Sequence, residues 1–490
     1  MRRIIRNILV IIIIFITIFQ PVAAKVEFNQ KLYKDLSENK NPIPYIKIPD
    51  YQRLILKNGL TLFLAEDHQI PALFINGMIR GGRNLESKEI AGISDCMVDM
   101  MTTGTQNFGE KDLDQYKEQY AIQFNFKADN DYLSFSSNAL ISEEEQLIAL
   151  VAEILQKPQF GTDYFQRKQS EWEQGLKHAK TQENDVLNLY FYNHLMEGHP
   201  YSFRYDLDLQ LAALNRITPK ELLQHYQRVV TPNNTILFVY GDFKPDRILE
   251  LISNYFSEWP RHETKPKLTK VKENKELYGQ IILVNKPDAT QAKIKMGYNF
   301  FDQSFLDRNI KERVAFEIAN QIYGGGDFES YLMNEIRSIK GFAYDIYADF
   351  FNHRLGGAYF INTSVKPEQA CETITTIKQI MSDLKNGTQK ITETEVFKIV
   401  NQRNAFFPEA FRYNESIITN LIMNVEFKDR DPNYLNKYIR LYNTVTAAKA
   451  QKAFTKYSFP EKLFTVIVGK KEAILPAFQE QGLKVKVIEL

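Results

Sequence analysis

The sequence is poor in cysteine and carries almost no net charge. Only two cysteines, Cys96 and Cys371, occur in 490 residues, one in each half of the chain. Two cysteines cannot form the disulfide framework of a small secreted domain, so we expect two buried thiols rather than a bridge. The 61 lysines and arginines are balanced by 60 aspartates and glutamates. This balance excludes the strongly basic surface that is typical of nucleic-acid-binding proteins.

Long apolar runs are also scarce, and the one near the N-terminus is short. Three arginines precede an apolar run over residues 8–19, which is followed by Pro21-Val-Ala-Ala24. A basic start, a short apolar core and small residues before a cleavage site are the parts of a secretory signal. The run is shorter than the roughly twenty residues that span a bilayer, which favours a signal peptide over residues 1–24 rather than an uncleaved anchor. We therefore expect a periplasmic or secreted protein with no membrane span after signal cleavage.

An approximate internal repeat divides the chain. A chain of this length exceeds one hydrophobic core and predicts at least two domains. A helical pattern that opens at Ile217-Thr-Pro-Lys leads into the apolar strand pattern 233–241, and a second one that opens at Val445-Thr-Ala-Ala leads into 461–469. In both halves a capped helix is followed by a short apolar strand that ends in glycine.

Other segments repeat in the same order. The alternating segment 73–79 matches 292–298, and helices with acidic first turns begin near Ser142 and Lys366. Each half therefore mixes strands and helices as an α+β domain does. The charged, proline-containing stretch 259–268 is typical of a linker. We predict two homologous α+β domains with a hinge between them: an N-terminal domain (25–258), a linker (259–275) and a C-terminal domain (276–490).

One segment of the first half carries a family resemblance. Residues 81–105, which begin Gly-Gly-Arg-Asn and end Thr-Thr-Gly-Thr, resemble the zinc-motif segment of the pitrilysin/insulinase family of zinc metallopeptidases. In that family a glycine and a small residue precede H-x-x-E-H, and a Gly-Thr pair follows on the next turn. The frame fits on both sides, but Asp95 stands at the first histidine, Val98 at the glutamate base and Asp99 at the second histidine.

These replacements remove the chemistry that the motif supplies. H-x-x-E-H puts two imidazole ligands on one helix face, with a glutamate that activates water. Val98 has no proton-accepting atom, and alignment through Glu183-Asn-Asp185 puts the family's third ligand, a glutamate, at or near Lys177. A lysine ammonium is a poor companion for zinc at neutral pH. The sequence therefore predicts a degenerate zinc site at Asp95, Val98, Asp99 and Lys177, with no metal or other cofactor bound by this chain.

Other interpretations of the acidic pair stay open. Asp95 and Asp99 are four residues apart, so their carboxylates share a helix face and could hold a hard cation such as calcium or magnesium. Alternatively they are solvated acids, or acids paired with Lys177 or another base. The scattered histidines lack ligand spacing, and His199-Pro-Tyr resembles a structural segment of the family, which indicates packing.

The second half keeps a different part of the family's site. Residues 323–344, which begin Tyr-Gly-Gly-Gly, resemble the family's glycine-rich turn, helix and Arg/Tyr signature. In active members the Arg and Tyr of this segment reach across a closed chamber to the zinc site of the opposite half. The resemblance implies substrate binding by the glycines, the arginine and the tyrosine, and catalytic roles for the last two: Gly324, Gly325, Gly326, Arg337 and Tyr344.

The residue types suit these roles. An arginine offers a fork of donors for carbonyl or carboxylate oxygens, and a tyrosine can donate to the oxyanion that forms when water attacks a peptide bond. A simpler interpretation is that three glycines before a helix are common and that Tyr344 begins a buried strand.

The contrast between the two halves implies a function. Two-subunit members of the family, such as the mitochondrial processing peptidase, pair a zinc-bearing subunit with one that has no zinc. We expect this chain to be the zinc-free subunit of a heterodimeric zinc endopeptidase that closes on its partner like a clam-shell around unfolded peptides. Zinc is then expected in the partner, a homologous zinc-binding subunit, and this chain alone is expected to be inactive. The alternatives are a catalytically inactive peptide-binding or scaffold homodimer, and independent hydrolysis by an unusual metal at Asp95 and Asp99.

Overall fold

The computed structural model describes residues 41–490 except 263–267 and 326–327. The predicted signal peptide and Gly326 lie outside these residues. Residues 43–490 form one compact unit. Within the described part of the chain, no helix is both long and apolar enough to cross a membrane. Cys96 and Cys371 are both buried and unbridged, as predicted.

The first half forms a six-stranded mixed sheet with the strand order β1-β2-β6-β3-β5-β4. Strand β6 runs parallel to β2, and the other neighbours are antiparallel. The predicted alternation is present in β3, where Leu73, Ile75 and Ile79 are buried in the core on one face. The strands are β1 (Gln52–Ile55), β2 (Thr61–Glu66), β3 (Ala72–Arg80), β4 (Gln123–Ala128), β5 (Tyr132–Leu140) and β6 (Thr235–Gly241).

The second half repeats this arrangement in the order β12-β7-β11-β8-β10-β9. Strands β7, β11, β8, β10 and β9 occupy the places of β2, β6, β3, β5 and β4, and β11 is again parallel to β7. The duplicated α+β fold is therefore confirmed. The strands are β7 (Ile281–Asn285), β8 (Ala292–Phe300), β9 (Ala343–His353), β10 (Gly356–Val365), β11 (Phe464–Gly469) and β12 (Lys486–Glu489).

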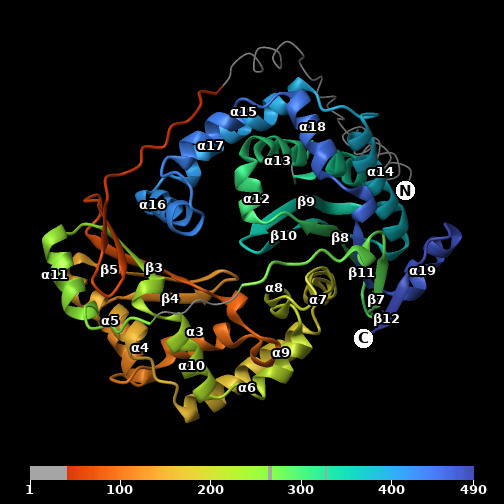
Figure 1. The fold of residues 1–490 in the computed structure, drawn as a ribbon. Helices are drawn as coiled ribbons and strands as arrows, with labels where there is room; N and C mark the ends of the chain where they lie inside the picture. The colour runs from red at the N-terminus through yellow and green to blue at the C-terminus, as the bar shows by residue number, and fades with distance from the viewer. Residues whose placement is uncertain (1–40, 263–267, 326–327) are drawn as a thin grey trace, which may run out of the picture. The chain divides into compact units, whose positions relative to one another are not determined.

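Helices cover the sheets in matching sequence order (Figure 1). In the first half they are α3 (Ile93–Thr103), α4 (Glu110–Gln119), α5 (Glu144–Gln156), α6 (Thr162–Ala179), α7 (Glu183–Leu195), α8 (Pro200–Phe203), α9 (Leu207–Leu214), α10 (Pro219–Val229) and α11 (Pro245–Phe256). In the second half they are α12 (Gln303–Arg308), α13 (Ile310–Gly324), the π-helix η6 (Met333–Ile339), α14 (Ala370–Asn386), α15 (Glu393–Ala410), α16 (Asn414–Ile422), the π-helix η8 (Met423–Phe427), α17 (Tyr434–Tyr442), α18 (Ala447–Tyr457) and α19 (Lys471–Glu480).

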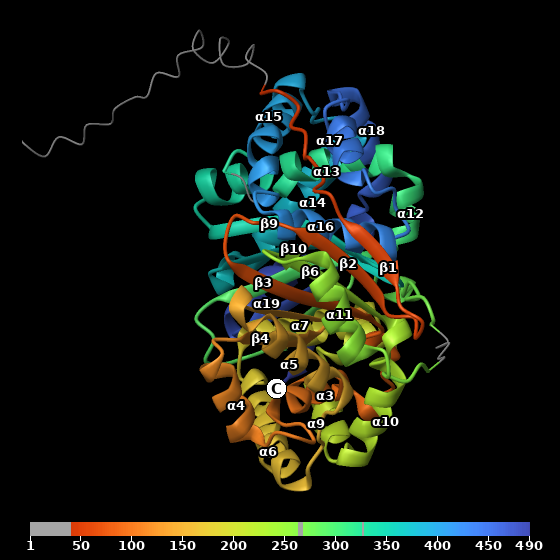
Figure 2. The same cartoon turned by 90° about the vertical axis from the view of Figure 1, so that its left-hand side faces the viewer.

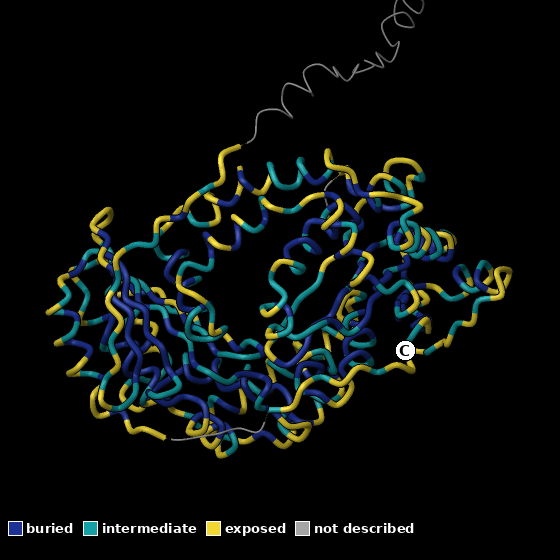
Figure 3. Tube along the Cα trace, turned by 45° about the horizontal axis from the view of Figure 1, so that its top comes forward, coloured by how far each residue is buried: buried dark blue, intermediate teal, exposed yellow. Residues whose placement is uncertain are grey.

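The predicted helix-to-strand units are present in both halves. Helix α10 has a proline at its first turn and leads into β6, and α18 leads into β11. The Thr446 side chain accepts a hydrogen bond from the amide of Lys449, which caps α18. Both strands are fully buried, because core residues pack on both of their faces. Figure 2 shows β6 between β2 and β3, and Figure 3 shows the buried trace in dark blue inside the molecule.

Each half covers one sheet face of the other half with a helix. Helix α7, from the first half, packs Phe191 and Leu195 against β7 and β11 of the second sheet. Helix α16, from the second half, packs Ile418 and Leu421 against β2 and β6 of the first sheet. Lys295 of β8 donates to Asn188 Oδ1 of α7 (2.6 Å), and its burial lowers the lysine pKa to about 8. The exchange buries apolar surface between the halves.

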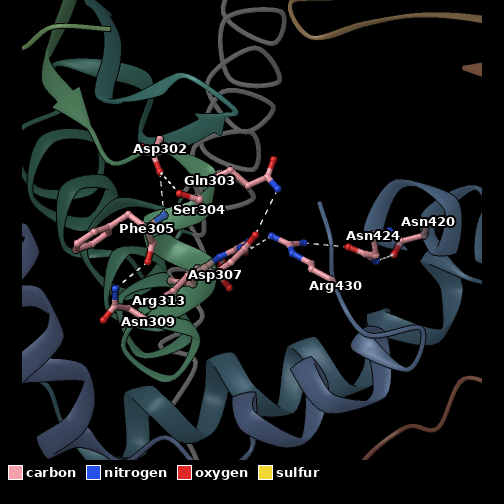
Figure 4. A network of polar contacts seen from close by, with 11 residues as sticks. Asp302, Gln303, Ser304, Phe305, Asp307, Asn309, Arg313, Asn420, Asn424 and Arg430 are labelled. Carbon is pink, nitrogen blue, oxygen red and sulfur yellow. Dashed lines mark hydrogen bonds and ion pairs between the residues drawn. The ribbon is translucent and has the colours of Figure 1, made fainter. Parts of the chain in front are cut away.

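A polar network holds the segment after α16 to its own half (Figure 4). Arg430 pairs with Asp307 at the end of α12, and Arg313 of α13 also reaches Asp307 (3.3 Å). Arg430 Nη1 donates to Asn424 Oδ1 (2.9 Å). Asn424 in turn donates to Asn420 of α16. The network therefore fixes α16 from behind while its apolar face lies on the first sheet.

The tips of two equivalent hairpins also meet. The β4–β5 turn carries Asn130 and Asp131, and the β9–β10 turn carries His353 and Arg354. The Arg354 amide donates to Asp131 Oδ2 (3.0 Å), and Asn130 Nδ2 lies 2.9 Å from His353 Nε2. Tyr201 of α8 donates to Asp131 Oδ1 (2.5 Å). The contacts of His353 and Arg354 join the halves at a second place, while the Tyr201 bond fixes Asp131 within the first half.

The predicted linker 259–275 has its ends in the two cores. Trp259 is 3% exposed and packs in the core of the first half. Near the other end, the amide of Val271 donates to the carbonyl of Leu355 (2.8 Å), and the Val271 side chain packs against the second sheet. The domain boundaries stay a prediction.

Candidate functional site

Helix α3 carries the three residues that replace the zinc motif, and a buried carboxylate accepts hydrogen bonds from the backbone at the start of this helix. Glu86 accepts hydrogen bonds from the amides of Gly92 (2.8 Å) and Ser94 (3.0 Å). These are amides that the first turn of a helix leaves unpaired. Gly92 has φ 88°, a left-handed conformation that favours glycine. Burial raises the pKa of Glu86 to about 7.

Asp95 is held by an arginine from the preceding segment. Arg83 Nη2 lies 2.6 Å from Asp95 Oδ1, and Arg83 Nε donates to Oδ2 (2.8 Å). The arginine side chain is only 9% exposed, whereas the aspartate side chain is 47% exposed. Such a two-pronged pair is the strong form of this interaction. Both oxygens of Asp95 are therefore engaged by a cation of the protein itself.

Asp99, one turn further on, is engaged by α6. Trp172 Nε1 donates to Asp99 Oδ2 (2.8 Å), and Lys168 Nζ lies 3.3 Å from Oδ1. Val98 is 5% exposed and belongs to the core of the first half. Asp95 and Asp99 are therefore both paired with a basic side chain, as one of the interpretations of the sequence expected. The bases are Arg83 for Asp95 and Lys168 for Asp99.

Lys177 does not join this group. Its ammonium lies 2.5 Å from Glu173 Oε1, one turn back on α6, and its side chain is 64% exposed. The residues of α6 that reach Asp99 are Lys168 and Trp172, which lie about two and a half turns and one and a half turns before Lys177.

Zinc does not fit this arrangement. Two carboxylates stand where imidazoles are needed, each is neutralised by a cationic side chain, and Val98 offers no acceptor for a proton of water. Among the described residues, no cluster of three or more His, Cys, Asp or Glu side chains could hold a metal ion.

His199 is a packed residue, as predicted. Its Nδ1 accepts from the amide of Tyr201 (3.1 Å), so the proton lies on Nε2, which donates to the carbonyl of Thr269 (2.8 Å). Burial lowers the pKa of His199.

The arginine and tyrosine of the second half lie together. Arg337 is on η6, and its Cζ lies 4.8 Å from the centroid of the Tyr344 ring on the edge strand β9. Tyr344 is 82% exposed, so the expectation of a buried strand start is wrong. Strand β9 is an edge strand, because it pairs only with β10 along the described chain.

The two described glycines of this segment have a packing role. A Cβ on Gly324 would lie 2.6 Å from Leu332 Cδ1 and 3.0 Å from Ala348 Cβ. A Cβ on Gly325 would lie 2.1 Å from Gln321 Oε1. These contacts let α13 end close to β9, which places Arg337 and Tyr344 beyond the turn.

Two features were missed from the sequence. Phe328 also stacks with Arg337, with 4.4 Å from Cζ to the ring centroid, although it is 63% exposed. Its only signal is an aromatic residue just after the glycines. A cavity of about 620 Å³ also lies between the first sheet and α16. No local sequence pattern indicates this cavity, because its lining comes from strands at three places in the first half and from a helix of the second half. The lining residues include Asn76, Ser134, Phe238, Glu415 and Ile422.

Two family models match most of the chain. The one described as "Insulinase (Peptidase family M16)" matches residues 64–203, and the one described as "Peptidase M16 inactive domain" matches residues 216–403. Together they span both sequence segments that resemble the family's site.

Three comparisons show what the chain is similar to. "Non-peptidase homolog YmxG" of Helicobacter pylori is 25% identical over 296 residues, which cover 58% of this chain and 63% of that protein, less than two thirds of its length. "Probable inactive metalloprotease YmfF" of Bacillus subtilis is 19% identical over 368 residues, 74% of this chain and 81% of that protein. The crystal structure of a peptidase M16 inactive domain from Pseudomonas fluorescens has a TM-score of 0.75 at 21% identity, covering 86% of this chain and 98% of that one. The chain therefore belongs to the M16, or insulinase, peptidase family.

Proposed function

We propose that this chain is the zinc-free subunit of a periplasmic or secreted two-subunit M16 endopeptidase. A homologous partner would carry the zinc, and this chain would contribute Arg337 and Tyr344 to the partner's site. The observation that carries the proposal is the contrast between the halves. The zinc position is neutralised from within by Arg83 and Lys168, whereas Arg337 and Tyr344 stand together with the tyrosine ring exposed.

The two residues would act on different parts of the peptide. The Tyr344 hydroxyl would donate to the oxyanion that develops on the scissile carbonyl, which is where a preorganised donor accelerates the reaction. The fork of Arg337 would hold a substrate oxygen and orient the peptide. An exposed tyrosine on an edge strand supports this role, because a substrate on the partner can reach it.

The first sheet offers a place for an extended peptide. Strand β4 is an edge strand, pairing only with β5 within the described residues, and such an edge can accept a further strand. Asn125 and Lys127 of β4 line the 620 Å³ cavity beside it. A peptide paired to β4 would direct alternate side chains toward that cavity.

Co-expression with a homologue that has an intact H-x-x-E-H motif tests the proposal. The two chains should co-purify and cleave an unfolded peptide that neither cleaves alone. Tyr344→Phe should lower kcat by about a hundredfold to a thousandfold, since that is the usual cost of one oxyanion donor. Tyr413→Phe, at an exposed tyrosine beside α16, is the matched control and should leave turnover unchanged. Wild-type turnover in both Tyr344→Phe and Arg337→Ala would show that these residues do not contribute to the partner's active site.

A second candidate is an inactive peptide-binding or scaffold homodimer. The cavity over the first sheet favours it, because the equivalent face of the second sheet is filled by the aromatic side chains of α7. A homodimer of this kind would bind peptides without a zinc-bearing partner. Sedimentation of the purified chain with a cavity-directed peptide separates the two candidates, since only the homodimer predicts tight self-association together with peptide binding.

A further inference from the structure

Arg337 lies over two exposed aromatic rings. Its Cζ is 4.4 Å from the centroid of Phe328 and 4.8 Å from that of Tyr344. The rings are 63% and 82% exposed, so they are not core residues that meet the arginine by chance of packing. Within the described part of the chain, no carboxylate pairs with the guanidinium of Arg337. The charge therefore lies against two rings and has no carboxylate partner among the described residues.

Other arginines of the chain show how unusual this is. Most of those that stack on a ring also pair with a carboxylate, and the pair accounts for their orientation. Arg412, for example, stacks on Tyr413 and reaches Glu409 (3.4 Å). Arg204 stacks on one tyrosine. Arg403 lies over two, Tyr438 and Tyr442, but both of these rings are buried and Arg403 also donates to the Tyr438 hydroxyl. The arginines that combine a ring and a carboxylate are Arg53, Arg80, Arg167, Arg412 and Arg430.

Stacking leaves the hydrogen-bonding edge of the guanidinium available. The rings interact with its electron-poor flat faces, whereas its five N–H donors lie in its plane and point outward. Fixing a flexible side chain in advance lowers the entropy cost of binding. Two parallel N–H donors match the two oxygens of a carboxylate better than the single oxygen of a carbonyl.

We infer that Arg337, which contacts the rings of Phe328 and Tyr344, is a receptor for a carboxylate of the bound peptide. Phe328 is then a positioning residue, and the substrates are peptides that carry either a free C-terminus or an acidic side chain. This inference rests on the proposed function, because it names the substrate class of the same site. A guanidinium with no carboxylate partner among the described residues favours a carboxylate, because the anion compensates its charge and can accept two parallel N–H bonds.

Three matched peptides distinguish the sources of the carboxylate. They are an N-acetylated hexapeptide of alternating Thr and Val with a free C-terminus, the same peptide as its C-terminal amide, and the amide with Glu at position three. Calorimetric titration of the full chain should show one acidic peptide binding about tenfold to a hundredfold tighter than the neutral amide. The tighter of the two acidic peptides identifies a C-terminal or a side-chain carboxylate.

Variants test whether Arg337 and its contact with Phe328 cause the preference for the acidic peptides. Arg337→Lys keeps the charge and loses the fork, and it should remove most of the preference. Phe328→Leu should reduce the preference and move the Arg337 Nε–H resonance away from its ring-shifted position, while Phe328→Tyr restores both. Arg412→Gln, a stacked arginine paired with Glu409, is the control that leaves the preference intact.

Several outcomes overturn the inference. They are equal affinity for the amide and both acidic peptides, no measurable binding of any of the three, or an unchanged preference in Arg337→Lys. The proposed function fails separately, because turnover with the zinc-bearing homologue would then not depend on Tyr344. Turnover that depends on Arg337 without any carboxylate preference overturns only the inference about the ligand.

Discussion

Arg83 and Asp95 form a two-pronged ion pair at the position where the family's zinc site begins, with 2.6 Å between Nη2 and Oδ1. The arginine is nearly buried and the aspartate is half-exposed, so the pair lies at the boundary between the core and the solvent in the first turn of α3. A cationic side chain here disfavours a bound divalent cation. Asp95, which replaces the first histidine of the motif, thus takes part in an ion pair of the fold.

Asp95→Asn should lower the free energy of unfolding by about 1–3 kcal/mol, because it leaves the Arg83 charge without its counter-ion in a mostly buried place. Asp114→Asn is the matched control, since Asp114 forms an exposed pair with Lys117 one turn along α4 and should cost about 0.5 kcal/mol or less. Urea unfolding measures both. Equal effects would show that the Arg83 pair contributes no more than a surface pair.

Zinc should not stabilise the isolated chain. A site with a Kd of about 1 µM would add roughly 2.7 kcal/mol at a hundredfold higher free zinc concentration. We expect the same melting temperature in EDTA and in 100 µM zinc, calcium or magnesium chloride. A rise in melting temperature that Asp95→Asn or Asp99→Asn abolishes would instead establish a cation site between those carboxylates.

The stability should fall in acid through His225. Arg228 donates to His225 Nδ1 (3.0 Å), so the ring proton lies on Nε2 and faces Ser94 Oγ (3.1 Å). Burial, and then the charge of Arg228, lowers the pKa of His225 to about 3. The unfolded chain takes up this proton below pH 6.5 and the folded chain does not, so stability is lost as the pH falls from 6.5 toward 3, by about 1.4 kcal/mol per pH unit.

His225→Gln removes this titration while keeping an acceptor and a donor in the side chain. The slope of unfolding free energy against pH should therefore be shallower between pH 6 and 4 in the variant than in the wild type. Urea unfolding at three pH values in that interval measures the slopes. Parallel slopes would mean that His225 is protonated in the folded protein.

The exchange of helices between the halves should make them unfold together. Phe191 of α7 is fully buried and stacks on Phe464 of the second sheet, with 5.9 Å between ring centroids. Phe191→Ala should cost about 3–5 kcal/mol. Phe406→Ala, at a 66% exposed position on α15, is the control and should stay within about 0.5 kcal/mol. A calorimetric trace in which only one half melts earlier in Phe191→Ala would contradict a shared interface.

Much of the fold was open to sequence reasoning. The repeat predicted the order of strands and helices, because alternation and helical period are local properties of neighbouring residues. The loss of zinc chemistry also followed directly, since no folding can give Val98 a proton-accepting atom. By contrast, no local pattern indicated that α7 would lie on the second sheet and α16 on the first, because apolar faces do not name their partners.

The sequence by itself determined that this protein is a duplicated α+β chain whose zinc motif cannot work as a zinc motif. Only the tertiary structure decided which groups hold the replaced residues, namely Arg83 for Asp95 and Lys168 with Trp172 for Asp99. It also decided that the Phe328 ring contacts Arg337. The physical reason is that ion pairs and ring stacking depend on distances between side chains that the chain brings together only when it folds.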